Sequence, residues 1–361
     1  MSRPRVVLLR GHNVNPWELR PWELLAERYD VRVLVTASNR FDVSSLGLRR
    51  EPVRALRDLV RSDLAVKGPG DRYLGLERAL AGADLVHSAE LGVWFSHQPA
   101  VLKERLGFKL VLTVWETIPF RATYRAFRGR AYREATIPRV DLFLAATERA
   151  RDCLLLEDVP AQRIEVSPPG VDADRFAGGR SEPEGPVVSP GRLVWEKGHQ
   201  DVLRALAAFR RGLVPGEPPR LLIVGAGPEE RRLRRYAEDL GVADLVEVRA
   251  DVPYDEMPAV FAQAAWVVLA SLPTPLWEEQ FGMVLAEAIV AGVPVVAAAS
   301  GAIPEVIGES GVLVQPGDWL GLARAIAGPV PAPDPTLAER YSAGAAAERI
   351  ARAYDRVLGS A

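Results

Sequence analysis

The sequence predicts an α/β protein made of two doubly wound parallel-sheet domains in tandem. Three observations support this fold class: short strands that are apolar throughout, amphipathic helices between them, and a restart of the same alternation in the second half. Strands that are apolar along their whole length are expected where helices cover both faces of a parallel sheet. The 361 residues also fit two domains better than three, since a domain averages roughly 150 residues.

The first half alternates apolar runs with helical patterns. A helix is expected to open at Pro21, because proline is favoured in the first turn. Further helical patterns cover residues 101–106 and 124–136. The expected strands are 6–9, 31–35, 85–87, 110–114 and 142–145.

The second half restarts the pattern after a linker. Residues 177–186 are rich in glycine, proline and charge and lack apolar periodicity, which is typical of a linker. We therefore expect a first domain at 1–176 and a second at 187–336. The expected strands of the second domain are 187–188, 221–224, 246–248, 266–270, 293–296 and 312–314.

A C-terminal helix is expected at 337–361, after the proline-rich stretch 328–336. Helical spacing places its apolar side chains on one stripe and its charged side chains opposite. The stripe consists of Ala343, Ala347, Ile350, Tyr354, Val357 and Leu358.

Composition excludes several classes of protein. The net charge is −2, so the basic excess of a non-specific nucleic-acid binder is lacking and no nucleic-acid partner is expected. The single cysteine, Cys153, cannot form an internal disulfide, and no Cys/His cluster has the spacing of zinc ligands. The N-terminal apolar run is too short for a signal peptide, and the longest uncharged stretch is interrupted by prolines. We therefore expect a cytoplasmic chain without a metal.

The candidate binding residues of the second half follow its strands and precede its helices. In doubly wound domains, ligands bind at the carboxyl ends of the strands. Gly191 and Arg192 come directly after a strand, and Lys197 precedes a helix. An arginine offers a planar fork of donors and a lysine a point charge, which together suit a diphosphate. Lys197 is one of only four lysines, so its position is more informative than that of an arginine.

A second motif surrounds the predicted start of a helix at Phe281 and Gly282. Free backbone N–H groups at a helix start form an anion site. Glu279 precedes this turn, and Glu287 falls near the buried flank of the helix, where a carboxylate needs polar partners. The two hydroxyls of a ribose are suitable partners. Taken alone, such a glutamate pair also fits an exposed helix face or a cap.

Taken together, these motifs resemble the retaining glycosyltransferases of family 4. The matching segments are SPPGVDADRF (167–176), GRLVWEKG (191–198), LLIVGAGPE (221–229), and Glu279 with Glu287 as the E-x7-E of the family. The resemblance implies the GT-B fold, with two Rossmann-like domains facing a cleft and the C-terminal helix crossing back to the N-terminal domain. It also implies transfer of a hexose from a UDP- or GDP-sugar to a small-molecule or lipid-linked acceptor. The resemblance further implies that the transfer retains the configuration at the anomeric carbon and uses neither a metal nor a cofactor. The product would be a cell-surface glycan, a glycolipid or a small glycoside.

The resemblance also implies roles for individual residues. Arg192 and Lys197 would hold the donor diphosphate, and Glu279 would lie by the sugar. Glu287 would bind the ribose. The remaining donor-binding residues would be Gly11, Gly191, Phe281, Gly282, Met283 and Val284.

The sequence departs from the family pattern mainly on the acceptor side. Gln280 replaces a usual glycine, and Trp115 with Glu116 stand where relatives often carry His-Asp. A second histidine after His87 is lacking. The candidate acceptor-side residues are His12, Asn15, His87 and Glu116.

Three other interpretations remain open from the sequence. Asp172 and Asp174 form a DxD pattern that elsewhere binds a metal-nucleotide. The GxG at 225–227 would suit an NAD-dependent oxidoreductase, although Glu230 occupies the third glycine position. A non-catalytic sugar-nucleotide-binding protein would retain the same donor residues.

One segment is strongly basic. From Arg121 to Arg139 the chain carries six arginines and one acid, with Tyr124, Phe127 and Tyr132 between them. Such a segment fits peripheral contact with an anionic membrane, on its inner face in a cytoplasmic protein. An exposed helix in an arginine-rich protein fits equally well.

Overall fold

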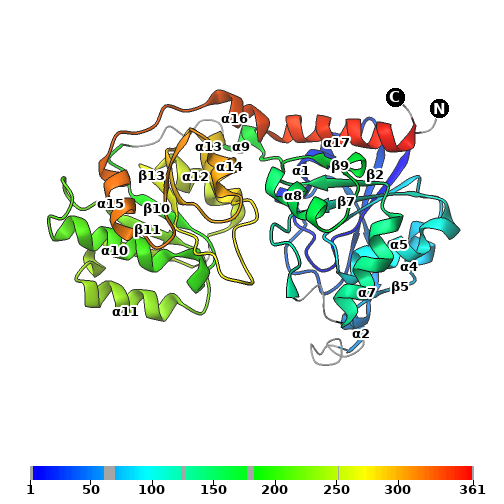
Figure 1. Cartoon of the computed structure of the whole chain (residues 1–361), viewed down its shortest axis with the longest axis horizontal. Coiled ribbons are helices and arrows are strands. Elements are labelled where there is room, and N and C mark those ends of the chain that lie inside the picture. The colour runs from blue at the N-terminus through cyan, green and yellow to red at the C-terminus, as the bar shows by residue number, and fades with distance from the viewer. Residues whose placement is uncertain (1–2, 61–69, 123–126, 177–182, 251, 360–361) are drawn as a thin grey trace. The chain divides into compact units, whose positions relative to one another are not determined.

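The computed structural model describes residues 3–60, 70–122, 127–176, 183–250 and 252–359. The chain forms two compact units (Figure 1). Unit 1 consists of residues 1–170 and 343–361, and unit 2 consists of residues 171–342. The chain therefore leaves unit 1 once and returns to it once.

Unit 1 is built on a seven-stranded sheet in the order β3-β2-β1-β6-β7-β8-β9, in which every pair is parallel. The strands are β1 (Arg5–Leu8), β2 (Asp30–Val35), β3 (Arg49–Pro52), β6 (Leu85–Ala89), β7 (Lys109–Val114), β8 (Leu142–Ala145) and β9 (Ile164–Val166), with an antiparallel pair β4 (Arg54–Ala55) and β5 (Tyr73–Leu74) beside them. The helices are α1 (Pro16–Glu23), α2 (Leu56–Val60), α4 (Leu76–Leu80), α5 (Trp94–Leu106), α7 (Phe127–Thr136), α8 (Glu148–Leu156) and α17 (Ala343–Leu358).

Unit 2 is built on a six-stranded parallel sheet in the order β12-β11-β10-β13-β14-β15. Its strands are β10 (Val187–Pro190), β11 (Leu221–Val224), β12 (Val246–Arg249), β13 (Trp266–Leu269), β14 (Val295–Ala298) and β15 (Gly311–Val314). Its helices are α9 (Ala173–Phe176), α10 (His199–Arg210), α11 (Glu230–Leu240), α12 (Met257–Ala262), α13 (Met283–Val290), α14 (Ile303–Ile307), α15 (Trp319–Ala327) and α16 (Pro335–Arg340).

The unit 1 sheet is covered on both faces. Val7 and Leu9 belong to one apolar core, whereas Val6 and Leu8 belong to another. Successive side chains of a strand point to opposite faces, so two cores mean that both faces are buried. This is the arrangement that the continuously apolar strands predicted, and the doubly wound fold class is confirmed.

The start of the first helix differs from the sequence expectation. The helix that was expected to open at Pro21 begins at Pro16 and ends at Glu23, so that prediction is wrong. Asn15 Oδ1 accepts the backbone N–H of Glu18 at 2.8 Å and caps the helix. Pro16 therefore takes the first-turn position that we had assigned to Pro21.

The unit boundaries also differ from the expected domain limits of 176 and 337. α9 belongs to unit 2, where the Phe176 ring packs near Phe261 with centroids 5.9 Å apart. α16 belongs to unit 2 as well, since the following Tyr341 donates its hydroxyl to Val306 O at 2.9 Å. Most of the expected linker, residues 177–182, lies outside the described residues.

The last helix, α17, packs on unit 1 and is red in Figure 1. Tyr354 on α17 is fully buried, and its Oη accepts the indole N–H of Trp22 at 2.8 Å. Gly170 lies against the start of α17, where a Cβ would come within 2.7 Å of Ala346 Cβ. No helix within the described ranges is both long and apolar enough to cross a membrane.

Candidate functional site

Glycines let the loops at the carboxyl edge of the unit 2 sheet pack backbone against backbone. A Cβ on Gly198 would overlap the Ala270 carbonyl oxygen, and a Cβ on Gly225 would overlap the Gly191 carbonyl oxygen. Both Gly198 and Gly225 also have positive φ values, +72° and +142°. Packing thus explains Gly225, and the dinucleotide interpretation of this glycine motif loses its main support.

Lys197 and Glu279 form an ion pair at this edge. Lys197 Nζ lies 2.7 Å from Glu279 Oε2, and the two side chains are only 14% and 11% exposed. Ser271 Oγ donates a hydrogen bond of 2.9 Å to the same carboxylate oxygen. The Lys197 ammonium also lies 5.4 Å from the centroid of the Trp277 ring. The structure therefore brings together two of the three residues predicted to be catalytic.

The third, Arg192, is exposed and its guanidinium has no ion-pair partner among the described residues. Its backbone is held by His199, whose Nε2 lies 3.2 Å from Arg192 O while Nδ1 lies 2.8 Å from Ser189 Oγ. Burial lowers the pKa of His199 to about 4, so the ring stays neutral at physiological pH. Arg192 is thus a cation on a fixed loop.

The α13 helix begins as the sequence predicted. Gly282 is its N-cap, with φ +84°, and supplies no side chain to cap the helix. The first N–H groups of an α-helix, here at Met283 and Val284, have no partner within the helix. Phe281 is buried and packs edge-on against Tyr341 with ring centroids 5.5 Å apart. The helix start is therefore fixed in position and open to an anion.

Glu287 lies on the buried face of α13 and is 3% exposed. Burial raises the pKa of its carboxyl group to about 7, against the opposing effects of Tyr254 and Arg175. Tyr254 Oη donates a 3.0 Å hydrogen bond to Glu287 Oε1. The Arg175 guanidinium lies 5.0 Å from the Tyr254 ring centroid and pairs with Asp255 at 2.7 Å. The predicted burial of Glu287 is confirmed.

Apart from Lys197, sequence reasoning missed the polar residues around the two glutamates. Ser271 follows β13 at the carboxyl edge of the sheet, and that position is the one signal that could have identified it. Tyr254 and Arg175 lie far from Glu287 in sequence, so no local pattern joins them.

The predicted acceptor-side residues of unit 1 lie near the carboxyl ends of its strands, with Gly11 beside them. Gly11 has φ +60°, and its N–H donates to Tyr73 Oη at 2.9 Å. His12 is buried, with Nδ1 at 2.8 Å from Thr36 Oγ1 and Nε2 at 2.5 Å from Asp71 Oδ2. These contacts hold the loop after β1 in one conformation.

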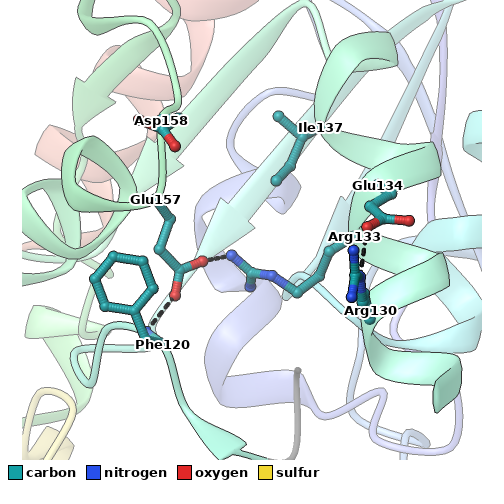
Figure 2. A pocket seen from close by; sticks show the side chains of 7 residues that line it. All are labelled: Phe120, Arg130, Arg133, Glu134, Ile137, Glu157 and Asp158. Atoms are coloured by element: carbon teal, nitrogen blue, oxygen red, sulfur yellow. Dashed lines mark hydrogen bonds and ion pairs between the residues drawn. The ribbon is translucent and has the colours of Figure 1, made fainter. Parts of the chain in front are cut away.

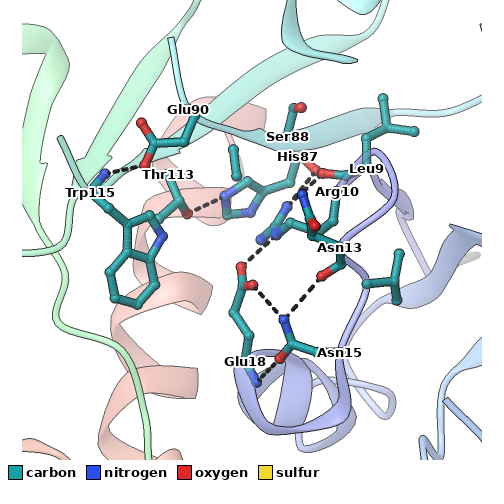
Figure 3. A network of polar contacts seen from close by, with 12 residues as sticks. Leu9, Arg10, Asn13, Asn15, Glu18, His87, Ser88, Glu90, Thr113 and Trp115 are labelled. Atoms are coloured by element: carbon teal, nitrogen blue, oxygen red, sulfur yellow. Dashed lines mark hydrogen bonds and ion pairs between the residues drawn. The ribbon is translucent and has the colours of Figure 1, made fainter. Parts of the chain in front are cut away.

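His87 belongs to the buried network drawn in Figure 3 and is not available to an acceptor. Its Nδ1 lies 2.7 Å from Tyr354 Oη and its Nε2 lies 2.8 Å from Thr113 Oγ1. Burial and the nearby Arg10 lower its pKa well below the ordinary value, so the ring is neutral. We correct the prediction: His87 joins the sheet to α17.

Asn15 and Glu116 also serve the local structure. Asn15 caps α1, as described above, and its amide nitrogen donates to Glu18 Oε2 at 3.2 Å. Glu116 is 4% exposed and accepts the N–H groups of Thr117 and Ile118 at 3.1 and 3.0 Å. Its other oxygen pairs with Arg121 at 2.7 Å. The contacts of both side chains are thus explained by the local structure, and their predicted acceptor role stays a prediction.

Glu90 is a further carboxyl residue at this edge, and sequence reasoning missed it. It follows β6 directly and has φ +63°, a positive value that residues other than glycine rarely adopt. Its Oε1 accepts the N–H of Trp115 at 2.9 Å, as Figure 3 shows. Burial raises its pKa to about 8.

The basic segment borders a cavity of about 490 Å³ between α7 and the end of α8. Figure 2 shows Arg133 reaching across it to Glu157, with which it forms a buried ion pair. Arg130 pairs with Glu134 at 2.7 Å on the same helix. Tyr124 and the rest of 123–126 lie outside the described residues. At least part of the positive charge in this segment is therefore already neutralised.

No three His, Cys, Asp or Glu side chains converge on a point where they could hold a metal ion, within the part of the chain that the structure describes. This includes Asp172 and Asp174 of the DxD pattern.

Two family models match consecutive parts of the chain. The model described as Glycosyltransferase Family 4 matches residues 15–175, and the model described as Glycosyl transferases group 1 matches residues 171–330. Together they span both units.

Curated relatives agree with these models. A D-inositol 3-phosphate glycosyltransferase of Salinispora arenicola is 31% identical over 314 residues, which cover 78% of this chain and 68% of the relative. A GDP-mannose-dependent alpha-(1-6)-phosphatidylinositol monomannoside mannosyltransferase of Mycolicibacterium smegmatis is 37% identical over 185 residues. That match covers 46% of this chain and 47% of the relative, so the chain spans about half the length of this relative.

The fold has close counterparts among solved structures. The Anabaena protein HepE, solved in complex with UDP and glucose, superimposes with a TM-score of 0.71 at 17% sequence identity. The superposition covers 98% of this chain and 100% of that one. The two Rossmann-like units, the family models and the Salinispora relative lead to one conclusion: the chain belongs to glycosyltransferase family 4 and has the GT-B fold.

Proposed function

We propose that this protein transfers a hexose from a UDP- or GDP-sugar to a hydroxyl group of an acceptor, with retention at the anomeric carbon. The observation that carries the proposal is the ion pair of Lys197 with Glu279 beside the uncapped start of α13. Departure of a nucleoside diphosphate develops negative charge on its phosphates. Fixed cations and helix N–H groups stabilise such charge without reorganising during the reaction.

The donor would occupy the carboxyl edge of unit 2. Lys197, Arg192 and the N–H groups at Met283 and Val284 would contact the diphosphate, and Glu279 would lie by the sugar. Glu287 would accept hydrogen bonds from the ribose hydroxyls. Tyr254 already donates to Glu287 Oε1, so the ribose would use the remaining lone pairs or displace that phenol.

The reaction would need no metal ion, because the cationic groups take over its role. Glu279 is the carboxylate beside the sugar, but its Oε2 is engaged by Lys197 and Ser271, so we do not assign it as a covalent nucleophile. We therefore favour a front-face route in which the leaving phosphate takes the acceptor proton. Activity in excess EDTA equal to activity without it is the expected result. Loss of activity in EDTA, with rescue by Mg²⁺ or Mn²⁺, would contradict it.

The acceptor that we propose is a polyol, free or lipid-linked. One relative described above is named for D-inositol 3-phosphate and the other for phosphatidylinositol monomannoside, an inositol lipid that carries a mannose. A lipid-linked acceptor would agree with a cytoplasmic enzyme that contacts an anionic membrane through residues 121–139.

The test is nucleotide release from UDP- and GDP-sugars, with and without myo-inositol, D-inositol 3-phosphate or phosphatidylinositol vesicles. Stimulated release, with a glycosylated product of retained configuration, is expected. A thermal shift with UDP or GDP but no release from any donor would favour the non-catalytic sugar-nucleotide-binding protein. A shift with NAD alone would favour the oxidoreductase.

A further inference from the structure

Glu90 is held in a strained conformation at the centre of the unit 1 sheet edge. Its φ is +63°, a region that disfavours residues with a Cβ. Its N–H donates to Thr113 O at 2.7 Å, and its Oε1 accepts the N–H of Trp115 at 2.9 Å. These contacts fix the carboxyl group between the ends of β6 and β7. Strain of this kind gathers at sites of function.

The second oxygen of this carboxyl group has no protein partner. Glu90 Oε2 is buried and makes no hydrogen bond among the described residues. In the network of Figure 3, Arg10 Nη2 is likewise buried and without a partner, although Arg10 Nε donates to Glu18 at 2.6 Å. A buried polar atom without a partner is unfavourable, and among the described residues this edge has one acceptor and one donor in that condition.

The charges around Glu90 select the kind of ligand. Glu116 and Glu18 lie near enough to raise the pKa of Glu90, whereas Arg121 and the Trp115 N–H lower it. Burial is the largest cause, and the pKa of about 8 leaves the group mostly protonated at pH 7. A neutral carboxyl group beside two acidic side chains suits a hydroxyl, which both donates and accepts, better than a phosphate.

We propose that Glu90 is a specificity-determining contact for the acceptor, its free Oε2 bonding a ring hydroxyl of a polyol. This inference rests on the proposed function and adds a residue and a ligand chemistry to it. Glu90 does not take the acceptor proton in the reaction. It orients the ring through a hydrogen bond that a mostly neutral carboxyl group makes.

The decisive variant is Glu90→Gly. Glycine adopts φ +63° without strain, which offsets the loss of the hydrogen bond from the Trp115 N–H, so the melting temperature is expected to stay near that of the wild type. Removal of the carboxyl group is expected to raise the KM for myo-inositol or D-inositol 3-phosphate by about ten-fold, the effect of one lost hydrogen bond. Nucleotide binding by unit 2 is expected to stay unchanged. A residue that only supports the fold would not raise the acceptor KM while the melting temperature stays near that of the wild type.

Asp158→Gly is the matched control. Asp158 is exposed and has the same φ, +63°, elsewhere in unit 1. The Asp158→Gly variant is expected to raise the melting temperature, since glycine relieves the strain of the positive φ, and to leave the acceptor KM unchanged.

Glu90→Gln tests the protonation state. The amide keeps an acceptor for the Trp115 N–H and presents a donor in place of Oε2. The acceptor KM of Glu90→Gln at pH 7 is expected to stay within about three-fold of the wild-type value, because the hydrogen bond to the acceptor is kept. We expect the wild-type KM to change between pH 7 and 9 as Glu90 loses its proton, and we expect Glu90→Gln to lack that change.

Four outcomes would overturn the inference. Two of them are an unchanged acceptor KM in Glu90→Gly and a rise of the acceptor KM in Asp158→Gly equal to that in Glu90→Gly. The third is a pH profile of the acceptor KM in Glu90→Gln that matches the wild type. The fourth is a wild-type nucleotide release that neither polyol stimulates. If the wild type cleaves no donor at all, the proposed function fails first and the inference falls with it. Donor cleavage in water without stimulation leaves the proposed use of the nucleotide-sugar donor standing and removes the polyol contact.

Discussion

Lys197 and Glu279 neutralise each other within unit 2, with Nζ and Oε2 2.7 Å apart. The ammonium group lies against the Trp277 ring as well, and the carboxylate oxygen that holds it is itself fixed by Ser271, so the ammonium group has little freedom to move. The pair therefore positions the cation before any donor binds. Removing either residue would also destabilise the fold, since the other charge would stay mostly buried without a partner.

Lys197→Ala is expected to reduce turnover by on the order of 10²–10³, as losing one fixed donor to a developing anion does. It is also expected to lower the melting temperature, because Glu279 would remain buried without its cation, at a cost on the order of 3 kcal/mol. Lys103→Ala is the control: Lys103 pairs with Asp141 at 2.8 Å in unit 1 and should lower stability alone. Wild-type turnover in Lys197→Ala would place the reaction elsewhere.

Arg192→Ala is expected to lower turnover by the same factor of about 10²–10³ without any loss of stability. The difference from Lys197 follows from the exposed guanidinium, which has no ion-pair partner among the described residues. Steady-state kinetics and a melting curve of the same preparation test both parts. A marked fall in melting temperature would contradict the structural argument.

Glu287→Ala is expected to weaken nucleotide binding, whereas Glu279→Ala should reduce turnover more than nucleotide affinity. A ribose contact is present in both ground and transition states, so its loss appears in binding. Isothermal titration with UDP and GDP measures the first effect, and kinetics at saturating donor measure the second. Unchanged nucleotide binding in Glu287→Ala would refute the ribose assignment.

Glu287 is also expected to make stability depend on pH. Its pKa is about 7 in the folded protein and 4.5 in the unfolded chain. The folded state holds this proton more tightly than the unfolded chain does. The protonated Glu287 therefore contributes fully to the free energy of unfolding below pH 4.5, and this contribution is lost as the pH rises through 7. The loss is on the order of 3 kcal/mol. Melting temperatures at pH 5 and pH 8 should therefore differ less in Glu287→Gln than in the wild type.

Gly170→Ala is expected to lower the melting temperature of unit 1 by loosening α17. The added Cβ would come within 2.8 Å of Ala343 Cα and 2.9 Å of Pro21 Cγ, and backbone cannot yield as a side-chain end can. Removing residues 343–361 should destabilise unit 1 more strongly, since Tyr354 is buried against Trp22 and His87. Melting of the truncated protein like the wild type would contradict the packing.

Vesicle binding tests the basic segment. Sedimentation with anionic but not zwitterionic vesicles is expected, with about 1 kcal/mol for each arginine engaged. Arg133 and Arg130 already have carboxylate partners, so the attraction should be weaker than six free arginines would give. Arg128→Glu should reduce binding, whereas Arg235→Glu on α11 should not. Equal partitioning onto neutral vesicles would exclude an electrostatic contact.

The strands of both sheets were predictable because burial on two faces leaves an apolar run in the sequence. The runs at 142–145 and 221–224 match β8 and β11 residue for residue. β3 was missed, because Arg49–Pro52 lies at the sheet edge and carries charged residues instead of an apolar run. Edge position removes the pattern on which the prediction depends.

The site was predictable where chemistry is local and not where it joins distant segments. The loop around Lys197 and the start of α13 carry their own glycines and charges, so the motif predicted both. The role of His87 was misjudged because its partner Tyr354 lies 267 residues away. Glu90 follows a strand at the carboxyl edge, as Ser271 does, but that position alone does not reveal that its φ is positive.

The return of α17 to unit 1 has a consequence for the order of folding. A ribosome releases residues 1–170 first, but the Trp22 and His87 side chains then lack the tyrosine that their hydrogen bonds need. Unit 2 is continuous in sequence and can close as soon as residue 342 has emerged. Of the two units, the one made first is therefore completed last. An emerging chain must keep the apolar face that receives α17 from aggregating throughout the synthesis of unit 2.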